Sequence, residues 1–316
     1  MFCSVIIPTI GRPSLAKAVQ SALEQELAAG DFEVVVVVDS GRPLPEADWQ
    51  ASPRVRIVET QRRDRCVARN TGAAVAAGDY FCFLDDDDWL LPGALAALQA
   101  AVEDTAVWVY GGVQFVDEQG GLLGKLNPGK QGNCLVEAVS AVWIPLQASL
   151  IRAEAFFAAG GFDPQTPVNE DLDLCRRLAF AGAFANTEAL VAAILRGTSL
   201  DRSTNAALGL GLNRRGREGI LARRGALGRL RDSAGRSGFY HGRILHAYIG
   251  SVIFNVKERR LWTAVSRALF AGMAFVLSGR RLFEAAYWRA LRTDTVTHEL
   301  IREPSPAFSS VAEWLH

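Results

Sequence analysis

Short apolar runs alternate with segments of helical periodicity over the first 110 residues. The apolar runs predict β-strands over residues 3–8, 33–38, 55–59, 80–84 and 106–110. Apolar residues at helical spacing predict helices over 15–23, 65–77 and 93–103, and Ser14 can cap the first of them. The run EVVVVV at 33–38 is typical of a strand that helices cover on both faces. This order predicts an α/β domain with a mainly parallel sheet flanked by helices, and ligands at the carboxyl ends of its strands.

The pattern changes after residue 113 and again after residue 205. Gln119, Gly120 and Gly121 predict a hairpin turn, residues 146–151 a strand, and residues 170–181 an amphipathic helix. Beyond Asn205 strand signals disappear, and Ala, Leu, Gly and Arg recur at helical spacing. We therefore predict two parts, a ligand-binding α/β domain over residues 1–205 and a basic helical region over residues 206–316.

Charge is divided unevenly along the chain. Lys and Arg number 34, as do Asp and Glu. Residues 1–213 hold 16 basic and 26 acidic side chains, a net charge of −10, whereas residues 214–316 hold 18 and 8, a net charge of +10. The basic helices could pack on the acidic part or on another subunit, or lie on an anionic membrane surface, with nucleic acid as a weaker alternative.

Amino-acid composition limits the class of protein and indicates the cellular compartment in which it works. Apolar residues make up 49% of the chain, which excludes disorder as the dominant state. The segment MFCSVIIPT predicts a first strand rather than a signal peptide. The uncharged apolar stretch over 268–278 is shorter than the ~20 residues that a span needs, so no transmembrane anchor is predicted. Five cysteines without a C-x-x-C pair indicate a reducing cytosol.

The strongest chemical signal is FLDDDDWLLP at residues 83–92. Four adjacent carboxylates after an apolar strand repel one another unless a cation or water neutralises them. Hard divalent cations choose oxygen ligands, and Mg²⁺ is commonly held by one or two carboxylates and by substrate phosphates. The position between an apolar strand and an apolar helix favours a site for a metal ion and a diphosphate over a solvated acidic loop.

Two further segments offer groups for the same chemistry. The segment GGFDPQTPVNEDLDLCRRLAFAG at 160–182 places Glu170 and Asp171 in the first turn of a helix. The macrodipole favours carboxylates there, and the alternative role is that of a general base. The segment RRDRCVARNTG at 62–72 places Arg65 and Arg69 in a helix that should pack under the aspartates. Arginine forks suit phosphate or a nucleotide edge.

Together with SVIIPTIGRP at 4–13 and VVVVDS at 35–40, these segments resemble glycosyltransferase family 2, nucleotide-sugar enzymes with the GT-A fold. The family's blocks recur in order over residues 2–195, with Ala68, Arg69, Asn70 and Gly72 at the expected places. The second strand departs from the family pattern, because Ser40 stands where an acidic residue often touches the donor. The resemblance implies a GT-A catalytic domain over 1–205.

The resemblance also implies roles for individual residues. It implies that donor-binding groups come from strand ends, two arginines and the D-x-D motif: Pro8, Thr9, Asp39, Arg65, Arg69, Asp85 and Asp86. Asp87 would ligate Mn²⁺ or Mg²⁺, Asp171 would be the catalytic base, and Glu170 would position the base or bind the acceptor.

Two other regions could contribute. Some related enzymes hold the metal with a late histidine, but residues 196–205 contain none, so Ser199, Arg202 or Ser203 could contact the diphosphate. Trp143 and Gln147 could touch the acceptor or simply pack.

The function that the resemblance implies is inverting, metal-dependent transfer of a sugar from a nucleoside diphosphate donor, a UDP-sugar before others. The acceptor would be a hydroxyl of a glycan or lipid-linked molecule, in surface polysaccharide synthesis. The alternatives are a non-catalytic nucleotide-sugar-binding or scaffold protein and, less favoured, a sugar nucleotidyltransferase. The expected location is the cytoplasm, where the protein could also contact the inner face of the membrane peripherally. Whether it forms a homo-oligomer stays open.

Overall fold

The computed structural model describes residues 1–27, 30–196, 206–292 and 301–302. Residues 1–152 contain, in chain order, β1 (Phe2–Thr9), α1 (Leu15–Leu23), β2 (Asp31–Val38), η1 (Asp48–Ala51), β3 (Val55–Glu59), α2 (Arg65–Val75), β4 (Tyr80–Phe83), β5 (Trp89–Leu90), α3 (Ala94–Ala100), β6 (Ala106–Val116), β7 (Leu122–Leu126), α4 (Leu135–Val139), η2 (Leu146–Ala148) and β8 (Ser149–Arg152). The later elements are α5 (Ala153–Ala158), α6 (Glu170–Ala181), β9 (Ala183–Leu195), α7 (Ala206–Leu221), α8 (Ala226–Ser233), α9 (Gly238–Lys257), α10 (Leu261–Ser278), η3 (Gly279–Phe283), α11 (Ala285–Arg292) and β10 (Ile301–Arg302).

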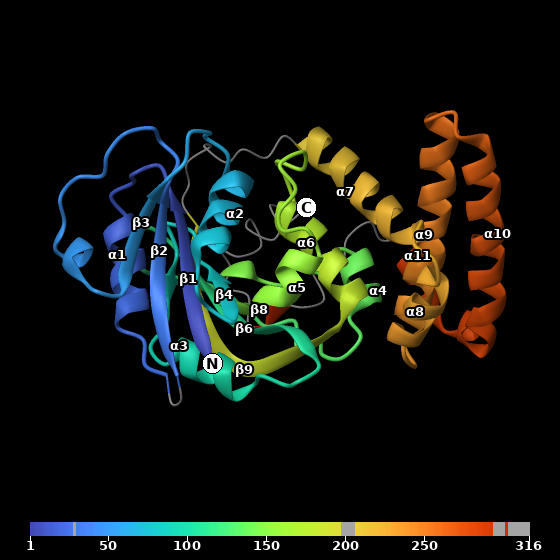
Figure 1. The fold of residues 1–316 in the computed structure, drawn as a ribbon. Helices are drawn as coiled ribbons and strands as arrows, with labels where there is room; N and C mark the ends of the chain where they lie inside the picture. Colours follow the sequence, from blue (N-terminus) through green and yellow to red (C-terminus); the bar gives the residue numbers. More distant parts are fainter. Residues whose placement is uncertain (28–29, 197–205, 293–300, 303–316) are drawn as a thin grey trace.

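One mixed sheet forms the centre of the N-terminal part (Figure 1). Its strand order is β10-β7-β6-β8-β4-β1-β2-β3, with β9 beside β6. Strands β4, β1, β2 and β3 are parallel, and Thr9 pairs with Val38 while Ile6 pairs with Phe83. The chain therefore leaves β1, β2 and β4 at the same edge of the sheet, which places the segments after Thr9, Val38 and Phe83 close together.

The strands and helices predicted for residues 1–110 are confirmed, with ends shifted by a few residues. The predicted N-cap role of Ser14 is wrong, because Ser14 makes no side-chain cap hydrogen bond. Helix α2 is capped instead by Asp64, whose Oδ1 accepts from the backbone N–H of Cys66 at 2.9 Å and of Val67 at 3.1 Å. The helix predicted over 170–181 is α6, and the predicted turn at 119–121 joins β6 to β7.

Two features of the second half differ from the prediction. Residues 146–151 are not one strand, because η2 precedes β8, and the Ser149 hydroxyl donates to the Pro145 carbonyl at 2.6 Å across that turn. The long strand β9 was not predicted. Its alanine-rich sequence has weak strand propensity, and its place beside β6 comes from parallel pairing with that buried strand.

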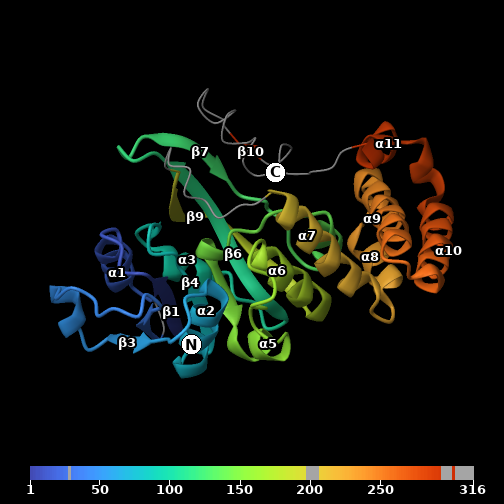
Figure 2. The ribbon, with the colours of Figure 1, turned by 90° about the horizontal axis from the view of Figure 1, so that it is seen from above.

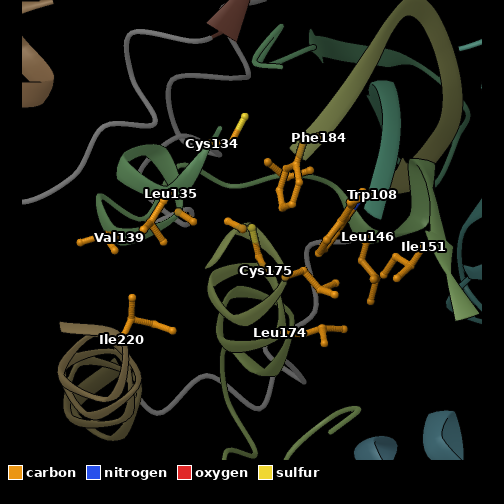
Figure 3. Packing of buried hydrophobic residues seen from close by; sticks show 14 of the residues in the cluster. Trp108, Cys134, Leu135, Val139, Leu146, Ile151, Leu174, Cys175, Phe184 and Ile220 are labelled. Carbon is orange, nitrogen blue, oxygen red and sulfur yellow. The ribbon is translucent and has the colours of Figure 1, made fainter. Parts of the chain in front are cut away.

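A hydrophobic cluster continues from the sheet into the C-terminal helices. Trp108 and Phe184 of the sheet, Leu174 of α6 and Ile220 of α7 belong to one cluster of buried side chains, as Figure 3 shows. The described residues from 206 to 292 form helices joined by short turns, as predicted, but Ile301–Arg302 form the strand β10, which pairs with β7 and was not predicted. The domain boundary predicted at residue 205 stays a prediction. Buried side chains from both sides of it pack in one hydrophobic cluster.

Helices α9 and α10 lie side by side at the end of the molecule farthest from β3, and α10 is outermost (Figures 1 and 2). The length argument against a transmembrane anchor does not hold, although the absence of an anchor itself stays a prediction. In the part of the chain that the structure describes, the segment Leu261–Phe283 is long and apolar enough by length and composition. The sequence prediction counted from residue 268 because of Arg267. In the structure that side chain is buried in an ion pair with Glu218.

Candidate active site

The segment Asp85–Asp88 follows the end of β4, and its four carboxylates make different contacts. Asp86 is buried, and its two oxygens accept from the Thr9 hydroxyl at 2.6 Å and from Nη1 of Arg12 at 2.8 Å. Asp87 is half-exposed, and Arg12 also reaches it, at 3.2 Å. Asp86 therefore anchors this segment to the end of β1, and its contact with a donor stays a prediction.

The other three aspartates, Asp85, Asp87 and Asp88, face one another. One carboxylate oxygen from each lies within 4.8 Å of the other two. Burial first, and then the charge of neighbouring carboxylates, raises the pKa of both Asp87 and Asp88. Mutual repulsion of this kind is relieved by a cation, and carboxylate oxygens are the ligands that Mg²⁺ and Mn²⁺ take. The three residues fit a divalent ion.

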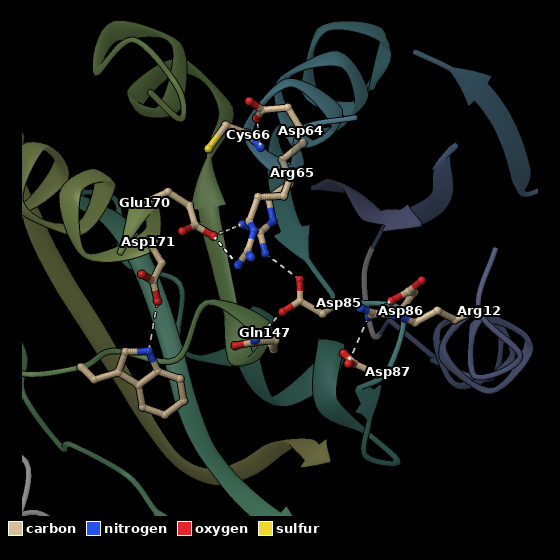
Figure 4. A network of polar contacts seen from close by, with 12 residues as sticks. Arg12, Asp64, Arg65, Cys66, Asp85, Asp86, Asp87, Gln147, Glu170 and Asp171 are labelled. Atoms are coloured by element: carbon tan, nitrogen blue, oxygen red, sulfur yellow. Dashed lines mark hydrogen bonds and ion pairs between the residues drawn. The ribbon is translucent and has the colours of Figure 1, made fainter. Parts of the chain in front are cut away.

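Arg69 connects the aspartates to α6. Its Nη2 donates to Asp85 at 2.6 Å and its Nη1 to Glu170 at 2.8 Å (Figure 4). Burial alone would lower the pKa of Arg69, but the adjacent charges of Asp85 and Glu170 raise it overall. Arg65 lies farther out and reaches the same oxygen of Glu170 at 3.4 Å. The buried guanidinium of Arg69 thus fixes the distance between the aspartates that follow β4 and the carboxylates at the start of α6.

Replacing Arg69 by Met is expected to destabilise the protein by about 3–5 kcal/mol, because two carboxylates then lose a buried partner. Urea unfolding would measure the loss. Arg42→Met is the control, since Arg42 lies exposed in the loop after β2 and should change stability by less than about 0.5 kcal/mol. Equal stability of Arg69→Met and the wild type would contradict this account of the ion pairs.

Asp171 is the second residue of α6 and is held by an aromatic side chain. The indole Nε1 of Trp143 donates to its Oδ2 at 3.1 Å, and the backbone N–H of Leu172 donates to its Oδ1 at 2.8 Å. Burial is the main cause that raises the pKa of Asp171, and the charge of Glu170 adds to it. A half-buried carboxylate of raised pKa, with both oxygens oriented, is suited to accept a proton.

The end of β2 supplies an unpaired acceptor beside this edge. Asp39 is buried, and its backbone N–H donates to the Thr9 carbonyl at 3.0 Å. Within the described part of the chain, Oδ1 of Asp39 has no hydrogen-bond partner. Burial raises the pKa of Asp39, and the charge of Arg63 opposes this. Pro8 is half-buried on the same strand end as Thr9. That these groups contact a nucleoside, as the resemblance implies, stays a prediction.

Residues 4–154 match the protein family described as Glycosyl transferase family 2. This chain is similar to that family over these residues, which make up just under half of its length. A Mycobacterium tuberculosis protein named "Pre-mycofactocin glycosyltransferase" is 31% identical over 161 residues, 47% of this chain and 34% of the relative. A Campylobacter jejuni protein named "GalNAc(5)-diNAcBac-PP-undecaprenol beta-1,3-glucosyltransferase" is 29% identical over 126 residues, 38% and 40% of the two chains. The chain thus matches only about a third of the length of the first relative.

The fold also matches a solved structure. The crystal structure of Staphylococcus aureus TarS residues 1–349 in complex with UDP-GlcNAc superposes with a TM-score of 0.53 at 12% sequence identity. The match covers 84% of this chain and 90% of that chain. At this identity the likeness concerns the fold, and it confirms the predicted α/β architecture of GT-A type with a helical C-terminal region.

The sequence prediction missed several residues of this candidate site. Arg12 was not singled out, although it follows the turn at Gly11 after β1. Gln147, expected to touch the acceptor or pack, donates to Oδ2 of Asp85 at 2.8 Å. Asp88 joins the aspartate cluster, and its Oδ1 accepts from the backbone N–H of Leu195. The predicted roles of Ser199, Arg202 and Ser203 fall outside the described residues.

Proposed function

We propose that this protein transfers a sugar from a nucleoside diphosphate donor to an acceptor hydroxyl with inversion at the anomeric carbon. The observation that carries the proposal is the link Asp85–Arg69–Glu170, which places the aspartate cluster and the neighbour of Asp171 on the two sides of one buried guanidinium. The TarS complex supports UDP-GlcNAc-like donors, and the name of the C. jejuni relative supports an acceptor linked to PP-undecaprenol. We propose a UDP-sugar as donor and a glycan or lipid-linked acceptor, in surface polysaccharide synthesis.

The proposed reaction is one displacement. The acceptor oxygen forms a bond to the anomeric carbon while the bond from that carbon to the diphosphate oxygen breaks, and the leaving diphosphate keeps the electron pair. Asp171, whose carboxylate is oriented by the hydrogen bond from Trp143, takes the proton of the acceptor hydroxyl. Asp85, Asp87 and Asp88 would hold Mn²⁺ or Mg²⁺, which supplies Lewis-acid stabilisation of the diphosphate charge when bound. Asp39, Thr9 and Pro8 are proposed to contact the nucleoside.

The remaining residues are assigned supporting roles. Arg65 is half-exposed at the outer side of Glu170, where it could also reach a phosphate. Arg69 and Glu170 keep the two halves in register. We also propose that residues 1–205 are the catalytic part and that residues 206–316 hold the enzyme at the cytoplasmic face of the membrane.

Replacing Trp143 by Phe is expected to lower kcat/KM about tenfold at acidic pH and less at alkaline pH. The indole hydrogen bond favours the charged carboxylate of Asp171, and such a bond contributes about 1.5 kcal/mol. Without it the pKa of Asp171 rises further, so the base form is lost at a higher pH. A pH–rate profile tests this, and an acidic limb that does not move would remove Trp143 from the account.

Thermal-shift screening of UDP-, GDP-, dTDP- and CMP-sugars, with and without Mn²⁺, tests the proposed donor class. A ligand in hundredfold excess over its Kd contributes about 2.7 kcal/mol to stability, which raises Tm by several degrees. We expect a UDP-sugar to do so, and more strongly with Mn²⁺. If no nucleotide sugar stabilises the chain in either condition, the proposed transferase function is contradicted.

A further inference from the structure

Helix α10 packs mainly small residues, together with Arg267, inward and exposes most of its large apolar residues, although Phe270 packs against Tyr248. The side that faces α9 and the rest of the protein is formed by Ala264, Arg267, Ala271, Ala274 and Ser278, all buried. Leu261, Trp262, Val265, Leu269, Met273 and Val276 are exposed on the other side. A helix of a water-soluble domain normally buries its large apolar side chains. The reverse arrangement is the one that helices adopt in lipid, where small residues form the helix–helix contacts.

We call this exposed side of α10 the outer face. Trp262 is 88% exposed and Val276 73% exposed. Among the described residues between 261 and 279, none of the exposed ones is charged. They spread over roughly 200° of the helix circumference. One docked helix covers less than this, and an exposed apolar surface of this width marks a contact with a membrane or with another protein.

Basic and aromatic side chains border the outer face at both ends. Arg259 and Arg260 precede α10, and Arg280 and Arg281 follow it. Two acidic residues, Glu258 and Glu284, lie at the same ends, and Glu284 accepts a hydrogen bond from the backbone of Gly238. Phe283 is 92% exposed. Arginine attracts anionic headgroups and aromatic rings favour the boundary between headgroup and hydrocarbon, so both borders fit a lipid surface.

We infer that the outer face of α10 binds an anionic lipid bilayer, with the helix axis in the plane of the interface and the arginines at both ends on the headgroups. A helix with a wide apolar face and basic borders binds through buried apolar area plus attraction to anionic lipid. The inference deepens the proposed membrane role of residues 206–316, and it is independent of the proposed transfer reaction because it rests only on the C-terminal helices and their borders.

The neighbouring helix argues for the interface rather than a span. Helix α9 runs along α10, and it carries His241, Arg243, His246 and Asn255. A spanning α10 would take these polar side chains into the hydrocarbon, where each is costly. Arg267 of α10 is paired with Glu218 of α7 on the inner side, which also keeps that side on the protein.

Sedimentation of the full chain with vesicles tests the inference. With phosphatidylcholine vesicles containing phosphatidylglycerol, we expect most of the wild type to pellet, and less to pellet with phosphatidylcholine alone. The variant Leu269→Asp/Val276→Asp should lose at least about tenfold in partitioning, since two charges enter the buried face. Leu122→Asp is the matched control, because Leu122 is an exposed apolar residue on the β6–β7 hairpin, and it should pellet like the wild type.

Two further readouts keep the test independent of folding. The double variant should retain the wild-type circular dichroism spectrum and the UDP-induced thermal shift, so that loss of lipid binding is separated from loss of the donor site. Trp262 emission should shift to the blue on vesicle addition, and Trp262→Phe should remove that shift. Alkaline carbonate should release the bound protein, as expected for an interfacial helix.

Three results would overturn the inference. One is absence of wild-type pelleting with anionic vesicles. Another is a wild type that is oligomeric without lipid and becomes monomeric in Leu269→Asp/Val276→Asp, because the outer face would then be a contact between copies of the chain. The third is resistance of the bound wild type to alkaline carbonate, which indicates a span.

Discussion

Replacing Asp171 by Asn is expected to lower kcat by about 100- to 10,000-fold, the range that a general base contributes, while the Kd for UDP changes by less than about twofold. The amide has the shape of the carboxylate and can still accept from Trp143, but it cannot take a proton from the acceptor hydroxyl. Radiolabelled sugar transfer measures the first quantity, and calorimetric titration with UDP measures the second.

Asp163→Asn is the matched control for this experiment. Asp163 lies exposed in the loop before α6, where it accepts from the backbone N–H of Gln165. It should keep wild-type kcat. A variant Asp171→Asn that retains more than about a tenth of wild-type kcat would remove Asp171 as the base. Loss of UDP binding together with transfer would instead assign it a structural role.

Replacing Asp87 by Asn is expected to lower transfer by at least about 100-fold and to abolish the gain in UDP affinity that Mn²⁺ provides. Asp87 is the most exposed member of the aspartate cluster, so it is the one most accessible to an ion that also binds a diphosphate. The removal of one charge weakens the site without removing a buried partner from the protein. Initial rates at several Mn²⁺ concentrations measure the effect.

Its neighbour Asp86 provides the control. Asp86→Asn should lose about 1–3 kcal/mol of stability, because its oxygens accept from Thr9 and Arg12, but Mn²⁺ should still stimulate UDP binding. Identical metal dependence in Asp87→Asn and the wild type would contradict the assignment of Asp87 as a ligand. Loss of metal dependence in Asp86→Asn alone would move the ligand role to Asp86.

The parts of the fold that sequence could predict are those fixed by local pattern. The EVVVVV run became the buried strand β2, and the apolar spacing after Pro167 gave α6 with its predicted ends. The acidic segment directly follows the apolar run that forms β4, so its place at the end of that strand could be predicted from the sequence. Parallel pairing then brings strand ends together without any further sequence signal.

Tertiary contacts decided the rest. Which aspartate binds Arg12 and which ones cluster depends on the turn after β4, and a row of identical residues contains no signal for it. The hydrogen bond from Trp143 to Asp171 joins segments that are far apart in sequence. Periodicity predicted a helical region beyond residue 205, but only the packing of α10 on α9 shows that the small residues of α10 point inward.

The proposed transfer reaction requires Asp85, Asp87 and Asp88 to bind a divalent ion together with a nucleoside diphosphate. Calorimetric titration of the wild-type chain with UDP, in Mn²⁺ and in chelator, tests it most directly. We predict at least about a tenfold tighter Kd in Mn²⁺, which corresponds to about 1.4 kcal/mol. The same Kd for UDP in both conditions would contradict the claim.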